Sequence, residues 1–227
     1  LQKLIAPGKE FNVNDSDEDQ FSLKIGKRVN RYELAFYGYQ GLWPTPQGFN
    51  DNGSVYFPKL NAYGASIRGP LTSGLFNAEV AYYQSKDDKS GRKPTIANSQ
   101  LRLLVGYEWE WFKNLTVNVQ YYVEHTQDFK RLIEHSFWPQ LEPEEYRQLL
   151  TTRLTYRTMQ QRLTYSLFVF YSPSDNDSYI RPSMSFRVND QWAIAAGLNL
   201  FSGRNQHSFF GQHEDNSNAW LRARYNF

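Results

Sequence analysis

The sequence predicts an all-β protein that forms a transmembrane antiparallel up-and-down β-barrel of about 12 strands. Three observations predict this fold class. Apolar side chains recur with period two along almost the whole chain, as they do in strands with one buried face. Short turns alternate with long polar loops. No segment has the roughly 18 consecutive apolar residues of a membrane-spanning helix, since Asn199 interrupts even the richest one, Trp192–Leu200.

The composition narrows the function classes. The 227 residues are 17% aromatic, so the chain carries enough apolar surface to form an ordered structure. The absence of cysteine excludes disulfides, thiolate metal sites and cysteine nucleophiles. A net charge of +2 is too small to predict binding to nucleic acid. Residues 1–19 lack the features of a signal peptide, which we expect to have been removed if the protein is exported.

The clearest predicted hairpin lies in the middle of the chain. Apolar side chains alternate strictly from Ser99 to Trp111 and, after a turn at 112–114, from Leu115 to Val123. The same alternation predicts further strands at Phe21–Lys27, Tyr32–Tyr39, Tyr63–Gly69, Phe76–Gln84, Leu150–Thr158, Leu163–Tyr171, Ile180–Val188, Trp192–Leu200 and Ala219–Phe227. Most of these segments approach the ~9 to 11 residues that a tilted strand needs to cross a bilayer.

The connections between these strands alternate in length. Short turns are predicted at Arg28–Arg31, Gly69–Leu75, Phe112–Asn114, Thr158–Gln161 and Asn189–Gln191. Longer polar segments lie between them, at Gln40–Pro58, Ser85–Asn98, His125–Leu149, Ser172–Ser178 and Ser202–Ser217. This is the layout of outer-membrane barrels, whose short turns are periplasmic and whose long loops are extracellular. A soluble sandwich or barrel would have shorter strands and a polar outer face.

The end of the chain adds a resemblance. Arg222–Phe227 ends in Phe, with Tyr225 on the same face, and resembles the C-terminal signature of Gram-negative outer-membrane β-barrel proteins of the porin-like kind. The resemblance implies a place in the bacterial outer membrane, among its lipid and lipopolysaccharide, and insertion by the barrel-assembly machinery. It identifies no specific subfamily. Aromatic side chains on the apolar face near the short turns would form the membrane girdle, notably Trp111, Trp192, Tyr225 and Phe227.

The number of predicted strands is odd, whereas bacterial single-chain barrels have an even number. Two explanations stay open. In the first, Leu1–Ala6 forms a short first strand, followed by a loop at Pro7–Gln20, and residues 1–227 form a single barrel domain of twelve strands. In the second, the chain is the C-terminal part of a larger barrel. The strand number matters because about eight strands enclose an interior filled by side chains, whereas roughly 16 to 18 leave an aqueous channel.

The face opposite the apolar one would line the lumen, and it is rich in charge. Its basic residues are Lys24, Arg68, Arg102, Arg153, Arg157, Arg162, Arg181, Arg187, Arg222 and Arg224, and its acidic residues are Glu79, Glu108, Glu110 and Glu124. The acids lie on the fourth to sixth predicted strands and most arginines on the seventh to eleventh. Facing walls of opposite charge would select polar or anionic solutes. Alternatively, the charges form ion pairs that plug a narrow barrel.

Aromatic residues share the predicted lumen face, at Tyr37, Tyr83, Tyr122, Phe168, Phe170 and Trp220. They would either form a track on which sugars or aromatic compounds stack or simply fill the interior. The sequence therefore predicts a porin-like outer-membrane channel for passive or weakly selective passage of small polar solutes, anions included. The alternative is a non-conducting barrel whose extracellular loops bind a partner or ligand.

An enzyme that modifies membrane lipids is the third hypothesis. It would need a nucleophile and a base within hydrogen-bond reach near the lipid interface. His125 ends a predicted strand, and the other histidines fall in loops with no triad spacing. We therefore expect no catalytic residues and no cofactor. We expect no metal site either, because the His and acidic residues at 207–215 match no metal-ligand spacing.

Two local features qualify the pattern. The longest loop carries Phe129, Leu132 and Ile133 at helical spacing, which predicts a short helix that narrows the mouth or packs on a partner. Pro182 lies within a predicted strand and indicates a bulge or a local sheet edge, because proline cannot donate to the ladder.

Overall fold

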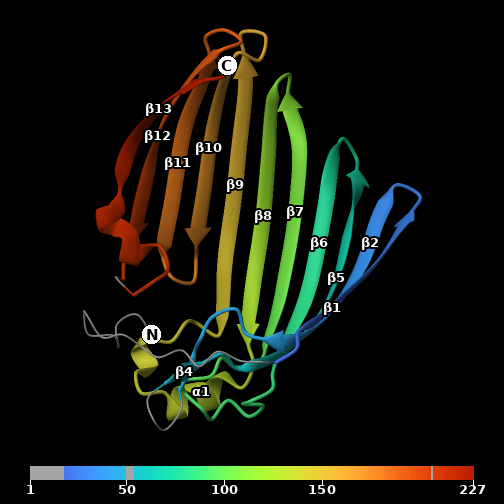
Figure 1. Cartoon of the computed structure of the whole chain (residues 1–227), viewed down its shortest axis with the longest axis vertical. Helices are drawn as coiled ribbons and strands as arrows, with labels where there is room; N and C mark the ends of the chain where they lie inside the picture. The colour runs from blue at the N-terminus through green and yellow to red at the C-terminus, as the bar shows by residue number, and fades with distance from the viewer. Residues whose placement is uncertain (1–17, 50–53, 206) are drawn as a thin grey trace.

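The fold is a single large antiparallel sheet. The computed structural model describes residues 18–49, 54–205 and 207–227. Eleven strands follow one another across the sheet in chain order (Figure 1). They are β1 (Phe21–Val29), β2 (Tyr32–Leu42), β5 (Lys59–Leu71), β6 (Gly74–Ser85), β7 (Gln100–Phe112), β8 (Leu115–Thr126), β9 (Tyr146–Thr158), β10 (Leu163–Ser172), β11 (Asp177–Arg187), β12 (Trp192–Gly203) and β13 (Asn218–Tyr225). The predicted all-β, up-and-down antiparallel architecture is therefore confirmed.

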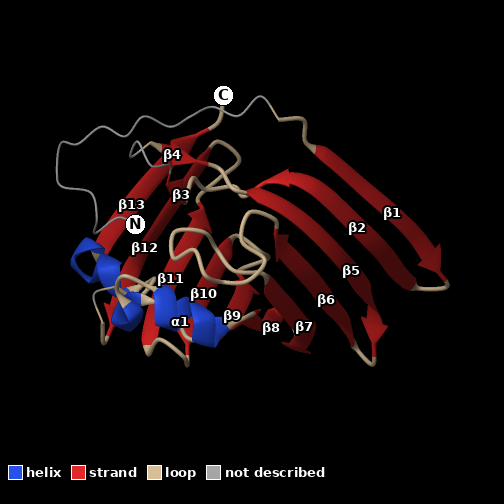
Figure 2. Ribbon diagram, turned by 90° about the horizontal axis from the view of Figure 1, so that it is seen from below, coloured by secondary structure: helices blue, strands red, loops and turns tan. Residues whose placement is uncertain are grey.

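The sheet is curved but not closed. Figure 2 shows β1 and β13 at its two ends, and these are the edge strands of the described chain. Each of the eleven strands predicted from the alternating pattern is present, several of them longer than predicted. The arrangement is consistent with a barrel. The candidate first strand at Leu1–Ala6 lies outside the described residues.

The long connections gather at one end of the sheet (Figure 1). They contain a hairpin of β3 (Gly48–Phe49) and β4 (Val55–Tyr56), helix α1 (Phe129–His135), and the 3₁₀ helices η2 (Pro139–Leu141) and η3 (Gly211–Asn216). The short helix predicted in the longest loop is thus confirmed as α1. No helix in the described ranges is long and apolar enough to cross a membrane.

One predicted long loop is a tight turn instead. Residues 172–178 do not form an extended connection, because β10 continues to Ser172 and β11 begins at Asp177. The Ser172 hydroxyl donates to the Asp175 carboxylate at 2.8 Å and fixes the reversal. The short turns at the opposite end follow the prediction. Asn30 and Asn114 adopt left-handed backbone conformations there, with φ of 55° and 69°, which Asn tolerates better than most residues.

The pairing register separates the side chains of the sheet into two faces. Tyr107 lies opposite Phe76 and Val119 on one face, whereas Glu108 lies opposite Asn118 on the other. The bulge predicted at Pro182 is absent, because the pairs before and after it keep one register and the missing N–H only interrupts the ladder to β12. A register shift occurs instead in β7, between Glu110 and Phe112.

Most of the strongly buried apolar side chains lie near the long connections, whereas Val117 and Ala35 are buried within β8 and β2. Those near the long connections include Trp43, Val55, Leu60, Ile96, Leu132 and Phe210. Along the strands, one face carries apolar side chains that are strongly exposed, such as Leu221 at 77% and Leu23 at 63%. Contiguous apolar exposure of this kind marks an interaction surface, and here it is compatible with contact to lipid.

Candidate functional site

The strand residues predicted for the lumen share one face of the sheet. We term it the concave face, because one cavity lies on it. Each of six strands contributes a side chain to the lining of this cavity: Lys24 of β1, Tyr37 of β2, Ala62 of β5, Tyr83 of β6, Arg102 of β7 and Tyr122 of β8. The pairing register also places Arg68, Arg153, Arg157, Arg181, Arg187, Arg222, Arg224, Glu79, Glu108, Glu110, Glu124, Phe168, Phe170 and Trp220 on this face.

Arg162 is placed differently from the prediction. It lies in the turn between β9 and β10, where its guanidinium donates to the carbonyl oxygens of Arg187 and Val188. The same group lies 5.5 Å from the ring centroid of Phe186, a residue of the opposite face. Arg162 therefore joins two turns and does not belong to the row of concave charges.

Six exposed arginines occupy the concave face of β9, β11 and β13. We term them the arginine wall, which consists of Arg153, Arg157, Arg181, Arg187, Arg222 and Arg224. Within the described residues, none of them forms an ion pair with a carboxylate. Arg181 and Arg222 both lie over the ring of Trp220, at 6.0 and 5.9 Å from its centroid. Unpaired charges of one sign raise the local potential and attract anions.

The acidic residues lie on the neighbouring strands β6, β7 and β8. Glu124 pairs with Arg102 at 3.0 Å and accepts the Tyr122 hydroxyl at 2.8 Å. Glu110 accepts the backbone N–H of Asn114 at 2.7 Å and so fixes a short turn. Glu108 contacts only the Asn118 amide, at 3.4 Å, among the described residues. These acidic groups thus lie apart from the arginine wall, whereas Arg102, Arg68 and Lys24 lie on the same side of the sheet as the acids.

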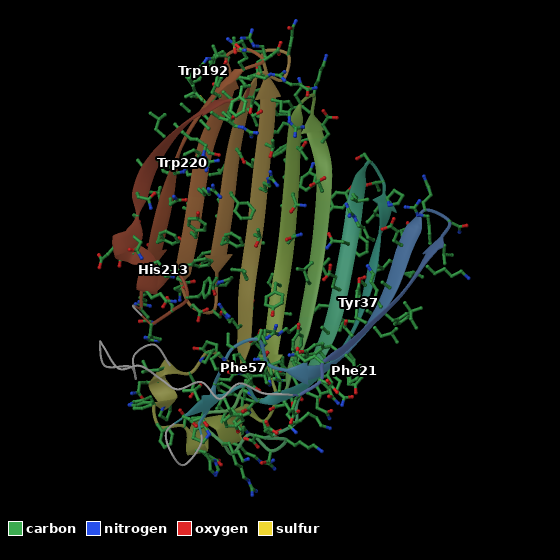
Figure 3. The ribbon with its side chains drawn as sticks, viewed as in Figure 1. Phe21, Tyr37, Phe57, Trp192, His213 and Trp220 are labelled. Atoms are coloured by element: carbon green, nitrogen blue, oxygen red, sulfur yellow. The ribbon has the colours of Figure 1, made fainter. Side chains whose placement is uncertain are left out.

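A cavity of about 1070 Å³ opens on the concave face of β1–β8 toward the long-loop end. Small residues of β5 and β6, namely Ala62, Gly64 and Ala81, form part of its lining, together with the larger rings of Tyr37, Tyr39, Trp43, Phe57, Tyr83 and Tyr122. Figure 3 shows Tyr37 on the sheet and Phe57 at the long-loop end. A more polar cavity of about 660 Å³ shares Lys24, Tyr37, Ser66 and Glu79 with it and extends to Arg28 and Glu33 near the short turns.

A second aromatic group lies across β10, β11 and β12. The ring of Tyr179 stacks between Phe170 and Phe201, with centroids 6.1 and 4.5 Å apart. Phe210, from the connection before β13, covers these rings, and the buried Asp177 carboxylate accepts its backbone N–H at 2.7 Å. This connection therefore folds onto the concave face at its long-loop end, where Figure 3 places His213.

Of the predicted girdle residues, the pairing register places Trp192 and Tyr225 on the opposite, convex face at the short-turn end. The Trp192 and Tyr225 rings pack at a tilted angle across the strand pair, with centroids 5.0 Å apart, and the centroids of Tyr225 and Phe227 lie 6.4 Å apart. Trp111 is 68% exposed and Phe227 is fully exposed. Figure 3 shows Trp192 at this end of the molecule. Such rings suit a membrane interface, because they combine an apolar body with a polar tip.

His125, His135 and His213 make structural contacts. His125 lies on the convex face, where its ring stacks on Tyr146 at 4.4 Å and pairs with Glu145 at 3.5 Å. His213 lies against Phe201. No serine hydroxyl bonds to a histidine in the described ranges, and no three His, Asp or Glu side chains there could hold a metal ion. The expectation of no enzymatic activity stays a prediction.

Sequence reasoning missed the contribution of the long connections to the concave face. Trp43 and Phe57 come from a segment predicted only as a polar loop, yet both line the large cavity. The signal lay in the apolar residues of that segment, since a buried Trp in a loop needs a surface to pack on. Asp177 and Phe210 were missed because their contact joins residues far apart in the sequence. The chain matches no protein-family model and no curated protein, so these geometric features carry the functional argument.

Proposed function

We propose that this chain forms the wall of a porin-like channel in the bacterial outer membrane that passes small polar solutes and favours anions. The arginine wall carries the proposal, because its six guanidinium groups are exposed on the concave face without carboxylate partners in the described chain. In a barrel plugged by ion pairs, these guanidinium groups would instead pair with carboxylates. The apolar convex face and its aromatic girdle support the membrane location.

The experiment is the reversal potential of the protein in a planar bilayer under a salt gradient. We expect an anion preference that shifts toward cations in the triple variant Arg153→Gln, Arg181→Gln and Arg222→Gln, because the charge that attracts anions is removed. The matched control is Arg131→Gln, which neutralises an arginine of α1 that pairs with Asp128 away from the sheet. An unchanged reversal potential in conducting triple-variant channels would contradict the proposal.

A non-conducting barrel that binds a partner through its loops is the second candidate. The exposed apolar side chains of the longest loop favour it, namely Phe137 at 66%, Trp138 at 40% and Leu141 at 39%. Single surface apolar residues are common, but three together in one loop suit a contact with another molecule. Absence of conductance in protein shown to be folded and inserted would support this candidate over the channel.

A further inference from the structure

The large cavity on β1–β8 forms where small side chains of the sheet lie beside large aromatic rings. Along β5 and β6 the concave positions are small, at Ala62, Gly64 and Ala81, while their neighbours are tyrosines. The Tyr37 ring packs over Gly64, where an added Cβ would lie 3.7 Å from the ring. The resulting space of about 1070 Å³ lies just above the range of roughly 300 to 1,000 Å³ for small-molecule sites.

The aromatic wall of this cavity is held in place by several contacts. Trp43 stacks on Tyr83 with ring centroids 5.9 Å apart, and the Arg102 guanidinium lies 4.0 Å from the Tyr83 centroid. Arg102 is in turn fixed by Glu124 at 3.0 Å. Rings positioned in this way present ready-made apolar surface to a ligand at little cost in conformational entropy.

Several polar groups around the cavity have no hydrogen-bond or ion-pair partner in the described chain, although the Lys24 ammonium lies 5.4 Å from the centroid of the Tyr37 ring. Trp43 is 5% exposed, and its buried indole N–H makes no hydrogen bond, although such a donor costs free energy when it is left unpaired. The Lys24 ammonium and the Glu79 carboxylate, both on the lining, form no ion pair. Lys24 and Glu79 are both exposed, so the site offers a strong donor and a strong acceptor at once.

The placement of these charges selects among ligand classes. Lys24 and Glu79 carry opposite charges, and Arg102 is paired with Glu124, which lies outside the lining, so no unpaired excess charge remains that would prefer an anion. Lys24 on β1 and Glu79 on β6 are three strand spacings apart, about 14 Å between their backbones. The ammonium and carboxylate groups of an amino acid are attached to one carbon atom and span much less than this backbone separation. A chain of sugar rings carries hydroxyl groups that donate and accept along its whole length, and its C–H faces pack on aromatic rings.

From these observations we infer that the cavity lined by Trp43, Tyr83, Lys24 and Glu79 binds a short neutral oligosaccharide. The rings of Trp43 and Tyr83 contact the sugar faces, and Lys24 and Glu79 bind hydroxyl groups of separate rings. This inference rests on the proposed function and deepens it, since it names a class of solute. The arginine wall is then a separate region, which acts on ions as they pass and not on the bound sugar.

The test is calorimetric titration of the folded protein in detergent with maltotriose and with cellotriose. We expect at least one of them to bind. Glu79→Gln and Lys24→Gln should each weaken this binding about tenfold, the usual effect of losing one hydrogen bond to a charged group. Both side chains are exposed and form no ion pair in the described chain, so we expect these variants to fold. Lys27→Gln, on the convex face of the same strand, and Glu214→Gln, in η3, are the controls and should bind as the unmodified protein does.

A second variant tests the aromatic contact. Trp43→Phe keeps a ring against Tyr83 but removes the indole, so the change in tryptophan fluorescence on sugar binding should shrink. The inference is overturned if neither trisaccharide binds, if both cavity variants bind as tightly as the controls, or if trigalacturonate or phenylalanine binds instead. Sugar binding by a protein that does not conduct ions would contradict the proposed channel function but support the sugar site. Conductance without sugar binding would support the channel function and contradict the sugar site.

Discussion

At the residue scale, the Arg102–Glu124 pair shows how burial decides what a charge contributes. The Glu124 side chain is 12% exposed and that of Arg102 is 27% exposed, and each has a further partner, in Tyr122 and Tyr83. The Arg28–Glu33 pair near the short turns has the same chemistry but lies in solvent. Since solvent screens exposed pairs, only the first pair should matter for stability.

We therefore expect Glu124→Gln to lower the free energy of unfolding by about 1–2 kcal/mol, because it leaves the Arg102 charge half-buried without its partner. Urea unfolding of the protein in lipid vesicles measures this effect. Glu33→Gln is the matched control and should leave the unfolding midpoint unchanged. Equal midpoints for both variants would show that the Arg102–Glu124 pair is as well solvated as the exposed one.

The loop between β6 and β7 contains a carboxylate that should make its order depend on pH. Burial of Asp88 by itself raises the pKa, but hydrogen bonds from the backbone N–H of Lys93 and from Ser90 outweigh it and hold the pKa below the usual 3.8. A lowered pKa contributes stability that is present above the unfolded value and is lost as the pH falls through the folded value.

Accordingly, we expect the loop at residues 86–99 to stay protected from hydrogen exchange down to about pH 4 and to lose protection below it. In Asp88→Asn, protection should be lower at neutral pH and should not change across this acidic range. Exchange that depends on pH in the same way in both proteins, after correction for the intrinsic rate, would contradict this role of Asp88.

At the scale of elements, the sequence predicted what depends on local pattern. Alternation over Leu101–Trp111 is enough to define a strand, because one face meets an apolar environment and the other does not. The alternating pattern could not predict β3 and β4, because each is only two residues long and too short to show a periodicity. Nor could it place Phe210 on Phe170, since that contact depends on how a long connection folds back. The strand residues of the candidate site were therefore predictable from the sequence, whereas the residues supplied by the connections were not.

The two faces of β7 and β8 give a direct test of which one meets lipid. Val105 lies on the convex face and Gln120 on the concave face at the same level of the sheet. We expect Val105→Lys to destabilise the protein by about 2–4 kcal/mol in phospholipid vesicles, the range for a lysine facing the bilayer core. Gln120→Lys, near Glu108, should change stability by less than about 0.5 kcal/mol. The reverse order of these effects would mean that the concave face is the outer one.

At the scale of the whole molecule, the open edges of the sheet are the dominant fact. β1 is exposed at every residue, and both β1 and β13 lack an outer partner in the described chain. Since neighbouring strands are antiparallel and the sheet has eleven of them, β1 and β13 run in the same direction. Closure by antiparallel pairing therefore requires an odd number of additional strands between them, and direct contact of β1 with β13 would form a parallel pair.

A bilayer makes one of these forms of closure necessary, because each unpaired backbone group in the hydrocarbon region costs several kcal/mol. We therefore expect the amides of Phe21–Val29 and Asn218–Tyr225 in the membrane-inserted protein to exchange as slowly as those of the central strands β7 and β8. Hydrogen exchange read by mass spectrometry measures this directly. Because the chain has no cysteine, a variant that carries one introduced cysteine in β1 and one in β13 can then report by crosslinking whether the two edges meet each other. Fast exchange at both edges of an inserted protein would show that the sheet stays open and that it contacts lipid as a sheet, not as a barrel.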